Sequence, residues 1–232
     1  RNVLIIGGNS DIGKSLVKYY LDRDCNVVVG YHKNLDCCDS GVKYIKCDVT
    51  DSYSIENIVR SMIDMYGNID VMINLSCICM DNSFLNKTKD EFMKVLEVNL
   101  VGTFLLNQIY SRYIDNGLII NMSSTDGIDT YSQYSIDYSA SKAGIINLSK
   151  SISLCSASRV ICICPNWVET SSTLSMNKDY LLDELKRISQ SRLISLDELV
   201  LGVANIINGD ITSGDIYRID IKGDKLWVEK VL

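Results

Sequence analysis

The chain has 232 residues and a formal net charge of −6, from 23 basic and 29 acidic side chains. Its hydrophobic fraction of 47% is far too high for an intrinsically disordered chain. No apolar run is long enough to cross a membrane, and the basic residues form no long cluster, so we expect neither a membrane nor a nucleic-acid partner. The length suits one domain over residues 1–232. The sequence opens on a strand-like run without the features of a signal peptide, which predicts a cytoplasmic protein.

Nine cysteines are spread along the chain without a CxxC pair, and there is one histidine, His32. In a protein without a secretory signal, such cysteines are typical of reduced thiols that pack as small apolar side chains. Their spacing does not match the usual structural zinc sites, so no metal site is predicted.

Taken in chain order, short runs rich in Val and Ile alternate with longer segments of helical periodicity. The predicted strands are 2–6, 26–31, 43–47, 69–75, 117–122, 159–164 and 214–220, and the predicted helices are 12–23, 54–66, 89–97, 99–114, 134–157 and 195–207. Near-continuous apolar strands are typical of a parallel sheet covered on both faces. We therefore predict an α/β fold with a doubly wound, mostly parallel, seven-stranded sheet and helices on both faces.

Two local signals add detail to this fold. Thr88 with Glu91, and Ser195 with Glu198, have the spacing of capping boxes at helix starts. The segment 166–194 is irregular and polar, and it would lie at the carboxyl ends of the strands, where open α/β sheets bind ligands. We expect it to form a substrate loop or lid.

The first predicted strand leads into a glycine-rich turn at the start of a helix. Glycines allow a tight turn and the close approach of a pyrophosphate, which the N–H groups and dipole of the helix N-terminus attract. A glycine-rich turn also occurs without any bound phosphate, so the prediction of a phosphate site depends on the strand–turn–helix context. The residues predicted to hold the pyrophosphate are Gly7, Asn9, Ser10, Asp11, Ile12 and Gly13.

The second predicted strand ends at Tyr31, which is followed by His32 and Lys33. Dinucleotide sites that prefer NAD usually place an acidic residue here, where it binds the ribose 2′-hydroxyl. His32 and Lys33 could instead neutralise a 2′-phosphate, although a loop lysine is also compatible with simple solvation. The missing acid favours NADP(H) over NAD(H) as the cofactor.

Tyr138 and Lys142 lie four residues apart in a predicted helix and therefore share one face. A nearby ammonium stabilises the phenolate, so we expect Lys142 to lower the pKa of Tyr138 from its ordinary value. A tyrosine tuned in this way passes a proton to a carbonyl oxygen. The YxxxK spacing is common by chance, but here Ser124 follows a predicted strand and Asn99 opens a predicted helix upstream.

The ordered set of motifs resembles the classical short-chain dehydrogenase/reductase family, and within it the 3-oxoacyl-acyl-carrier-protein reductase-like members. The resemblance covers nearly the whole chain and implies a single-domain Rossmann fold. The motifs that carry it are the glycine-rich turn, Asp48-Val49, strand-end Asn74, Val98-Asn99-Leu100, Ser123-Ser124, the YxxxK pair and the stretch Pro165-Asn166-Trp167-Val168-Glu169-Thr170.

The resemblance implies a role for each matching residue. Tyr138 would be the general acid and Lys142 would bind the nicotinamide ribose and lower the Tyr138 pKa. Ser124 would orient the substrate carbonyl, and Asn99 would hold a water in the proton relay. The further cofactor contacts that it implies are Tyr31, His32, Lys33, Asp48 and Val49 on the adenosine side, and Asn74, Pro165, Val168 and Thr170 on the nicotinamide side.

Three residues depart from the family pattern. Asp11 stands where the middle glycine of the turn is usual, and we expect it to cap the N–H groups of the following helix. Cys77 replaces a glycine near the cofactor, so its side chain must be accommodated there. Asn166 replaces the glycine after Pro165, and we expect it to adopt the left-handed backbone that asparagine tolerates.

Two assignments are open at this point. Ser124 lies one residue farther from Tyr138 than is common in the family, and Thr125 would fit the shorter spacing; we assign Ser124 because it aligns better with the strand end. The small residues Ala140, Ser141, Ala143 and Gly144 suit either a contact between subunits or packing on the chain's own sheet. The resemblance implies a homodimer or homotetramer.

We predict an NADP(H)-dependent oxidoreductase that transfers a hydride between the nicotinamide and a carbonyl or alcohol substrate, with a 3-oxoacyl thioester as one candidate. One alternative is an NAD-dependent sugar, polyol or steroid-type alcohol dehydrogenase. Another is a nucleotide-binding regulatory protein with weakened catalysis, which Asp11, Cys77 and Asn166 motivate.

Overall fold

The computed structural model describes residues 1–33, 35 and 39–231. Its strands form one sheet, in the order β3-β2-β1-β4-β5-β6-β7-β8. All neighbouring pairs are parallel except β7 and β8, which are antiparallel. The strands are β1 (Asn2–Ile6), β2 (Asn26–Tyr31), β3 (Val42–Lys46), β4 (Val71–Asn74), β5 (Leu118–Met122), β6 (Arg159–Pro165), β7 (Ile216–Lys222) and β8 (Lys225–Lys230). The strand order reverses between β1 and β4, which is where doubly wound sheets open a crevice for ligands.

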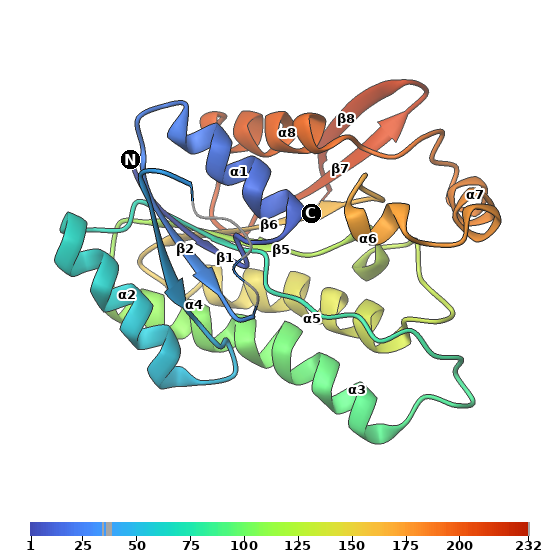
Figure 1. Cartoon of the computed structure of the whole chain (residues 1–232), viewed down its shortest axis with the longest axis horizontal. Coiled ribbons are helices and arrows are strands. Elements are labelled where there is room, and N and C mark those ends of the chain that lie inside the picture. The colour runs from blue at the N-terminus through green and yellow to red at the C-terminus, as the bar shows by residue number, and fades with distance from the viewer. Residues whose placement is uncertain (34, 36–38, 232) are drawn as a thin grey trace.

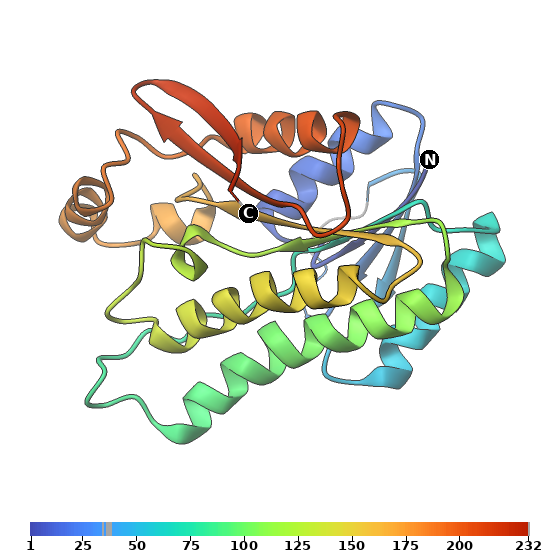
Figure 2. The same cartoon turned by 180° about the vertical axis from the view of Figure 1, so that it is seen from behind.

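Helices cover both faces of the sheet, with α1 and α8 on one side and α2, α4 and α5 on the other (Figures 1 and 2). The helices are α1 (Asp11–Leu21), α2 (Ser52–Tyr66), α3 (Lys89–Leu96), α4 (Gly102–Tyr113), α5 (Ile136–Ser153), α6 (Ser171–Leu174), α7 (Lys178–Arg187) and α8 (Leu196–Asn208). Among the described residues, no helix is both long and apolar enough to cross a membrane.

The central strand β1 shows why its sequence is apolar throughout. Val3 and Ile5 pack into the core beneath α1 and α8, whereas Leu4 and Ile6 pack into the core beneath α2 and α4. Side chains alternate between the faces of a strand, so a strand covered on both sides must be apolar at every position. Full burial of each such side chain contributes about 1.5–3 kcal/mol to stability.

The predicted doubly wound, mostly parallel sheet is confirmed, and three elements go beyond the prediction. Strand β8 adds an eighth strand to the expected seven. Exposed and partly buried residues mostly alternate along Lys225–Lys230, which follows a tight turn at Gly223. This pattern is the sequence signal that could have predicted β8, as the second strand of a short hairpin at the sheet edge. The segment 166–194, expected to be irregular, contains the helices α6 and α7.

The helix starts follow the predicted chemistry. At α3, Thr88 Oγ1 accepts a hydrogen bond from Glu91 N at 3.2 Å and Glu91 Oε2 accepts one from Thr88 N at 2.8 Å. Ser195 and Glu198 form the same capping box at α8. The predicted helices 89–97 and 99–114 are joined by a π-helical turn at Glu97–Val101, a feature frequent at functional sites.

Candidate active site

The glycine-rich turn has a geometry that only glycine allows at two positions. Gly7 has a φ of +77°. A Cβ atom on Gly13 would lie 2.5 Å from the Cα of Gly8, so the first turn of α1 packs directly on the strand-to-helix loop. The helix is capped by Ser10, whose Oγ accepts a hydrogen bond from Gly13 N at 3.1 Å. Ile12 packs against the core beneath the turn, as expected.

Asp11 does not cap the helix, so that expectation was wrong. It is the first residue of α1, and its Oδ2 accepts a hydrogen bond from Ser171 N at 2.6 Å, at the start of α6. This bond is the main reason why the pKa of the Asp11 carboxyl is lowered. The carboxylate therefore has a partner away from the turn, and the glycines and helix N-terminus fit a pyrophosphate.

The residues predicted to contact the adenosine lie together at the ends of β2 and β3. His32 Nε2 is 3.3 Å from Asp48 Oδ2, and Asn9 Nδ2 donates to Lys33 O at 3.0 Å. A backbone hydrogen bond from Thr50 is the main cause of a lowered pKa at Asp48. Among the described residues of this edge, the Asp48 carboxylate faces His32, and the Lys33 side chain is exposed.

Two predicted asparagines are buried and bind within the protein. Asn74 Nδ2 donates to Thr103 Oγ1 at 2.9 Å. Asn99, in the π-helical turn, donates to Ile78 O at 2.9 Å and to Ser141 Oγ at 3.0 Å, and its Oδ1 accepts from Ile78 N at 2.8 Å. The Asn99 side chain therefore connects the segment after β4 to helix α5.

The predicted catalytic side chains Ser124, Tyr138 and Lys142 lie together at the carboxyl edge of the sheet. Ser124 lies close enough to the Tyr138 side chain to lower the pKa of the phenol. Lys142 Nζ is 5.2 Å from the centre of the Tyr138 ring and donates to Met122 O at 2.9 Å. Thr125, the alternative to Ser124, is buried and donates its hydroxyl to the side chain of the residue after Pro165. The geometry favours Ser124 over Thr125 as the neighbour of Tyr138.

The pKa of Tyr138 shifts in the direction opposite to the expected one. Burial raises it well above its ordinary value, and the adjacent Cys77, Asp126 and Cys79 raise it further, whereas the Ser124 hydrogen bond lowers it. The expected lowering by Lys142 is not among the main causes of the shift, and Lys142 Nζ donates to the Met122 carbonyl oxygen. Tyr138 is therefore a protonated phenol at neutral pH and can donate a hydrogen bond or a proton.

Asn166 does not adopt the expected left-handed backbone, since its φ is not positive. Its amide instead bridges three segments. Nδ2 donates to Asp220 Oδ1 at 3.0 Å, and Oδ1 accepts from Thr125 Oγ1 at 3.1 Å and from Trp167 N at 3.0 Å. The side chain is buried, so these bonds replace the water that it loses on folding.

The segment 166–194 is joined to the fold at both ends. Val168 pairs with Ile194 in an isolated parallel bridge, and Glu169 N donates to Ile194 O at 2.8 Å. Thr170 caps α6 by accepting a hydrogen bond from Thr173 N at 3.2 Å. Pro165, Val168 and Thr170 therefore follow one another along the edge where the strands end.

The expectation of core packing holds for some of the described cysteines and not for others. Of those described, Cys47, Cys162 and Cys164 are buried and Cys25 is partly buried, whereas Cys77, Cys79 and Cys155 are exposed, and all seven are free thiols. Cys37 and Cys38 lie outside the described residues. Among the described residues, no three His, Cys, Asp or Glu side chains gather as metal ligands.

Sequence reasoning missed Asp126, which lies two residues after Ser124. Burial raises the pKa of its carboxyl, and Thr130 Oγ1 donates to its Oδ1 at 2.5 Å. Its charge also acts on Tyr138. The signal in the sequence was a carboxylate placed two residues after the Ser-Ser motif.

Comparison with known proteins places this geometry in a family. The profile described as short chain dehydrogenase matches residues 1–181. A 3-oxoacyl-[acyl-carrier-protein] reductase of Vibrio cholerae serotype O1 is 27% identical over 213 residues, which cover 87% of each chain. An uncharacterized oxidoreductase of Thermotoga maritima is 28% identical over 183 residues, 72% of this chain and 71% of that protein.

Solved structures agree with these matches. A short chain dehydrogenase from Leptospira borgpetersenii with bound NAD⁺ superposes with a TM-score of 0.81 at 27% identity, over 95% of this chain and 91% of the other. A dehydrogenase/reductase from Sinorhizobium meliloti has a TM-score of 0.85 at 20% identity, over 94% and 92% of the two chains, and supports the fold alone. With the profile match over residues 1–181, these findings show that the chain belongs to the short-chain dehydrogenase/reductase family of nicotinamide-dependent oxidoreductases.

Proposed function

We propose that this protein is a carbonyl reductase that prefers NADP(H), with Tyr138 as the proton donor. The observation that carries the proposal is the meeting of Ser124, Tyr138 and Lys142 at the carboxyl edge of the sheet, the edge at which the turn after β1 that suits a pyrophosphate also lies. A tyrosine is protonated at neutral pH, and a protonated phenol is the acid that the oxygen of a carbonyl needs when it is reduced.

Each residue has a defined task in this proposal. A nicotinamide cofactor supplies the hydride when it is bound. Ser124 donates a hydrogen bond that orients the substrate carbonyl, and Tyr138 gives its proton to the same oxygen. Lys142 orients the nicotinamide ribose, and Asn99 holds a water for the proton relay. Orientation of this kind accounts for a large share of enzymatic rate enhancement.

The cofactor contacts follow the positions along the strand ends. We assign the pyrophosphate to Gly7, Asn9, Ser10, Asp11, Ile12 and Gly13, the adenosine to Tyr31, His32, Lys33, Asp48 and Val49, and the nicotinamide to Asn74, Pro165, Val168 and Thr170. The turn is the best supported of the three, because a side chain on Gly13 would collide with the backbone.

The proposed preference for NADP(H) rests first on the missing acidic residue after β2 and second on Lys33. Its ammonium is exposed at the end of β2, and no acidic residue follows that strand directly. The contact between His32 and Asp48 favours the second candidate, an NAD-dependent alcohol dehydrogenase, because Asp48 offsets one of the two expected cations. Dissociation constants for NADPH and NADH, measured for the wild type and for Lys33→Glu, separate the two. We expect NADPH to bind more tightly to the wild type and to lose that advantage in the variant.

The substrate class is a small carbonyl compound, and a 3-oxoacyl thioester is the specific candidate. The similarity to a 3-oxoacyl-[acyl-carrier-protein] reductase supports it. Acetoacetyl-CoA, diacetyl and cyclohexanone, each tested with NADPH and NADH, cover a thioester and two simple ketones. Preferred turnover of acetoacetyl-CoA would support the thioester, and turnover of glucose with NAD⁺ alone would favour the alcohol dehydrogenase.

The subunit contacts are proposed on helices α4 and α5, which lie side by side on one face (Figure 2). Val101 and Phe104 near the start of α4 are exposed apolar side chains, and Ala140 and Ala143 are exposed on α5. Small and apolar residues of this kind suit a close contact between copies in a homodimer or homotetramer. Light scattering on the purified protein measures the number of subunits in the assembly.

The free thiols of the described cysteines support a reducing compartment such as the cytoplasm.

The experiment that tests the proposed reaction is Tyr138→Phe. The variant retains the ring and loses the proton donor, so we expect turnover to fall by about 10²–10⁴-fold while the dissociation constant for NADPH changes little. Undiminished reduction would refute Tyr138 as the acid. A wild type that binds NADPH and reduces none of the carbonyls would instead favour the regulatory protein with weakened catalysis.

A further inference from the structure

A buried ion pair lies directly before Tyr138. Lys87 Nζ is 2.9 Å from Asp137 Oδ2, and their side chains are 3% and 0% exposed. Lys87 belongs to the segment between β4 and α3, and Asp137 is the second residue of α5. Two charges removed from water carry a large desolvation cost, which is met only when each charge has its partner and further hydrogen bonds.

Both charges have such further bonds. The Lys87 ammonium also donates to the carbonyl oxygen of Met80. Asp137 Oδ1 accepts a hydrogen bond from the backbone N–H of Tyr138 at 2.9 Å. Ser135, which precedes α5, makes no capping bond to the helix, so the Asp137 carboxylate takes this role at the residue that carries the phenol.

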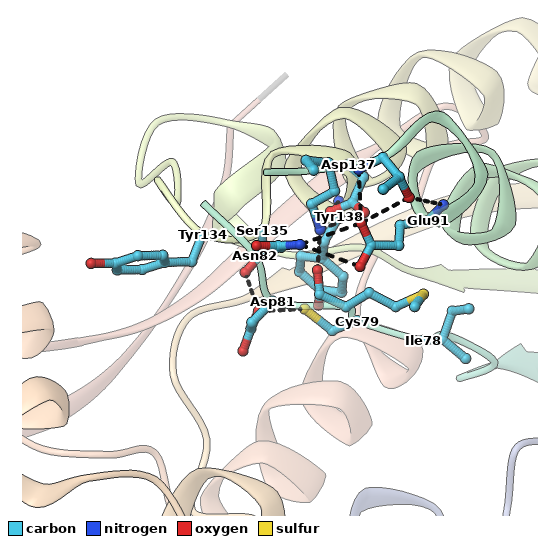
Figure 3. A network of polar contacts seen from close by, with 12 residues as sticks. Ile78, Cys79, Asp81, Asn82, Glu91, Tyr134, Ser135, Asp137 and Tyr138 are labelled. Carbon is cyan, nitrogen blue, oxygen red and sulfur yellow. Dashed lines mark hydrogen bonds and ion pairs between the residues drawn. The ribbon is translucent and has the colours of Figure 1, made fainter. Parts of the chain in front are cut away.

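The segment after β4 contacts the start of α5 through several more bonds. Figure 3 shows this network, in which Asp81 and Asn82 face Tyr134 and Ser135 ahead of Asp137 and Tyr138. Ser135 Oγ donates to Asp81 Oδ1 at 2.7 Å, and Asn82 N donates to Tyr134 O at 2.9 Å. After Tyr138, Asn99 reaches Ser141 Oγ at 3.0 Å. Helix α5 is thus held on both sides of Tyr138, and Lys87 with Asp137 forms a buried ion pair in this contact.

We infer that Lys87 is a positioning residue for Tyr138. It fixes the Asp137 carboxylate, which fixes the Tyr138 backbone and so the place of the phenol relative to Ser124. This role rests on the proposed function of Tyr138 as proton donor. A displacement of about 1 Å at a reacting group costs on the order of 10²-fold in rate, so a fixed helix start has a direct effect on turnover.

The first variant is Lys87→Met, which retains an unbranched chain and removes the charge. We expect kcat to fall by about tenfold or more, with the KM for NADPH changed less than about twofold. The solvent deuterium isotope effect on kcat should rise, because proton donation becomes slower. Lys87→Arg retains the cation and should restore most of the activity.

A second variant separates positioning from stability. Lys87→Met leaves the Asp137 carboxylate buried without its partner, whereas Lys87→Met with Asp137→Asn removes both charges, so that no ion is left buried and unpaired. We expect the double variant to fold and still to have a low kcat. Val203→Ala, a buried change in α8, is the matched control for a loss of stability away from this network.

The outcomes separate this inference from the function on which it rests. Wild-type kcat in the folded double variant, or a loss confined to NADPH affinity, overturns the positioning role alone. The same kcat loss in Val203→Ala as in Lys87→Met also overturns it. If the wild type reduces none of acetoacetyl-CoA, diacetyl and cyclohexanone with either cofactor, the proposed function fails and the inference fails with it.

Discussion

The most direct test of the cofactor site is the substitution Gly13→Ala in the first turn of α1. The new Cβ would lie 2.5 Å from Gly8 Cα, 2.6 Å from Gly8 C and 2.7 Å from Gly7 O. All three atoms are backbone, so no side-chain rotation can relieve the contact, and the turn must move away from the helix. Overpacking of this kind costs about 1–3 kcal/mol. If this cost falls on the bound conformation, the dissociation constant for NADPH rises by roughly five- to 150-fold, at about 1.4 kcal/mol per tenfold.

The assay is a fluorescence titration with NADPH, alongside a thermal melt of each variant. Gly67→Ala is the matched control, because Gly67 ends α2 with a φ of +80° and open space around its Cα. It should lose stability through backbone strain and bind NADPH like the wild type. Gly13→Ala that folds and binds NADPH within about twofold of the wild type would refute the close-packed turn as the pyrophosphate site.

Three further predictions concern charge and stability. Asp126→Asn removes a charge that raises the Tyr138 pKa, so the alkaline fall in the reduction rate should move to lower pH; an unchanged pH profile would contradict this. Asp11→Ala loses the bond to Ser171 N, so hydrogen exchange at 171–174 should accelerate, whereas Asp11→Asn retains an acceptor and should stay close to the wild type. Ser195→Ala breaks a capping box, which should lower the free energy of unfolding by about 1 kcal/mol and the Tm by about 2–4 °C, with unchanged NADPH binding.

The parts of the fold that the sequence predicted are those set by local patterns. The apolar run at Asn2–Ile6, the glycines of the turn and the capping boxes each depend on residues within a few positions of one another. Strand β8 was missed because an edge strand needs only a weak alternation of apolar and polar residues. Its place in the sheet depends on its pairing with β7, which the local sequence does not show. Helices α6 and α7 were missed because they are only 4 and 10 residues long and contain few buried apolar residues, so no long helical pattern is visible in the sequence.

The parts of the site that were not predicted depend on contacts between distant residues. The pKa of Tyr138 is set by burial and by Cys77 and Asp126, and none of these follows from the YxxxK spacing. The ion pair of Lys87 with Asp137 joins residues 50 positions apart. A local motif identifies which side chains can react, whereas the tertiary packing decides their protonation.

The departures from the family pattern bear on whether the chain has lost its chemistry. Loss of function relaxes the requirement for specific contacts, so a drifting site should show unmatched polar groups. Asp11 instead binds Ser171 N across 160 positions, and Asn166 places its amide between Thr125 and Asp220. Cys77 is the exception, because it is an exposed thiol beside Tyr138. Asp11 and Asn166 thus each have specific hydrogen-bond partners within the fold, which weighs in favour of a maintained oxidoreductase over a regulatory relative.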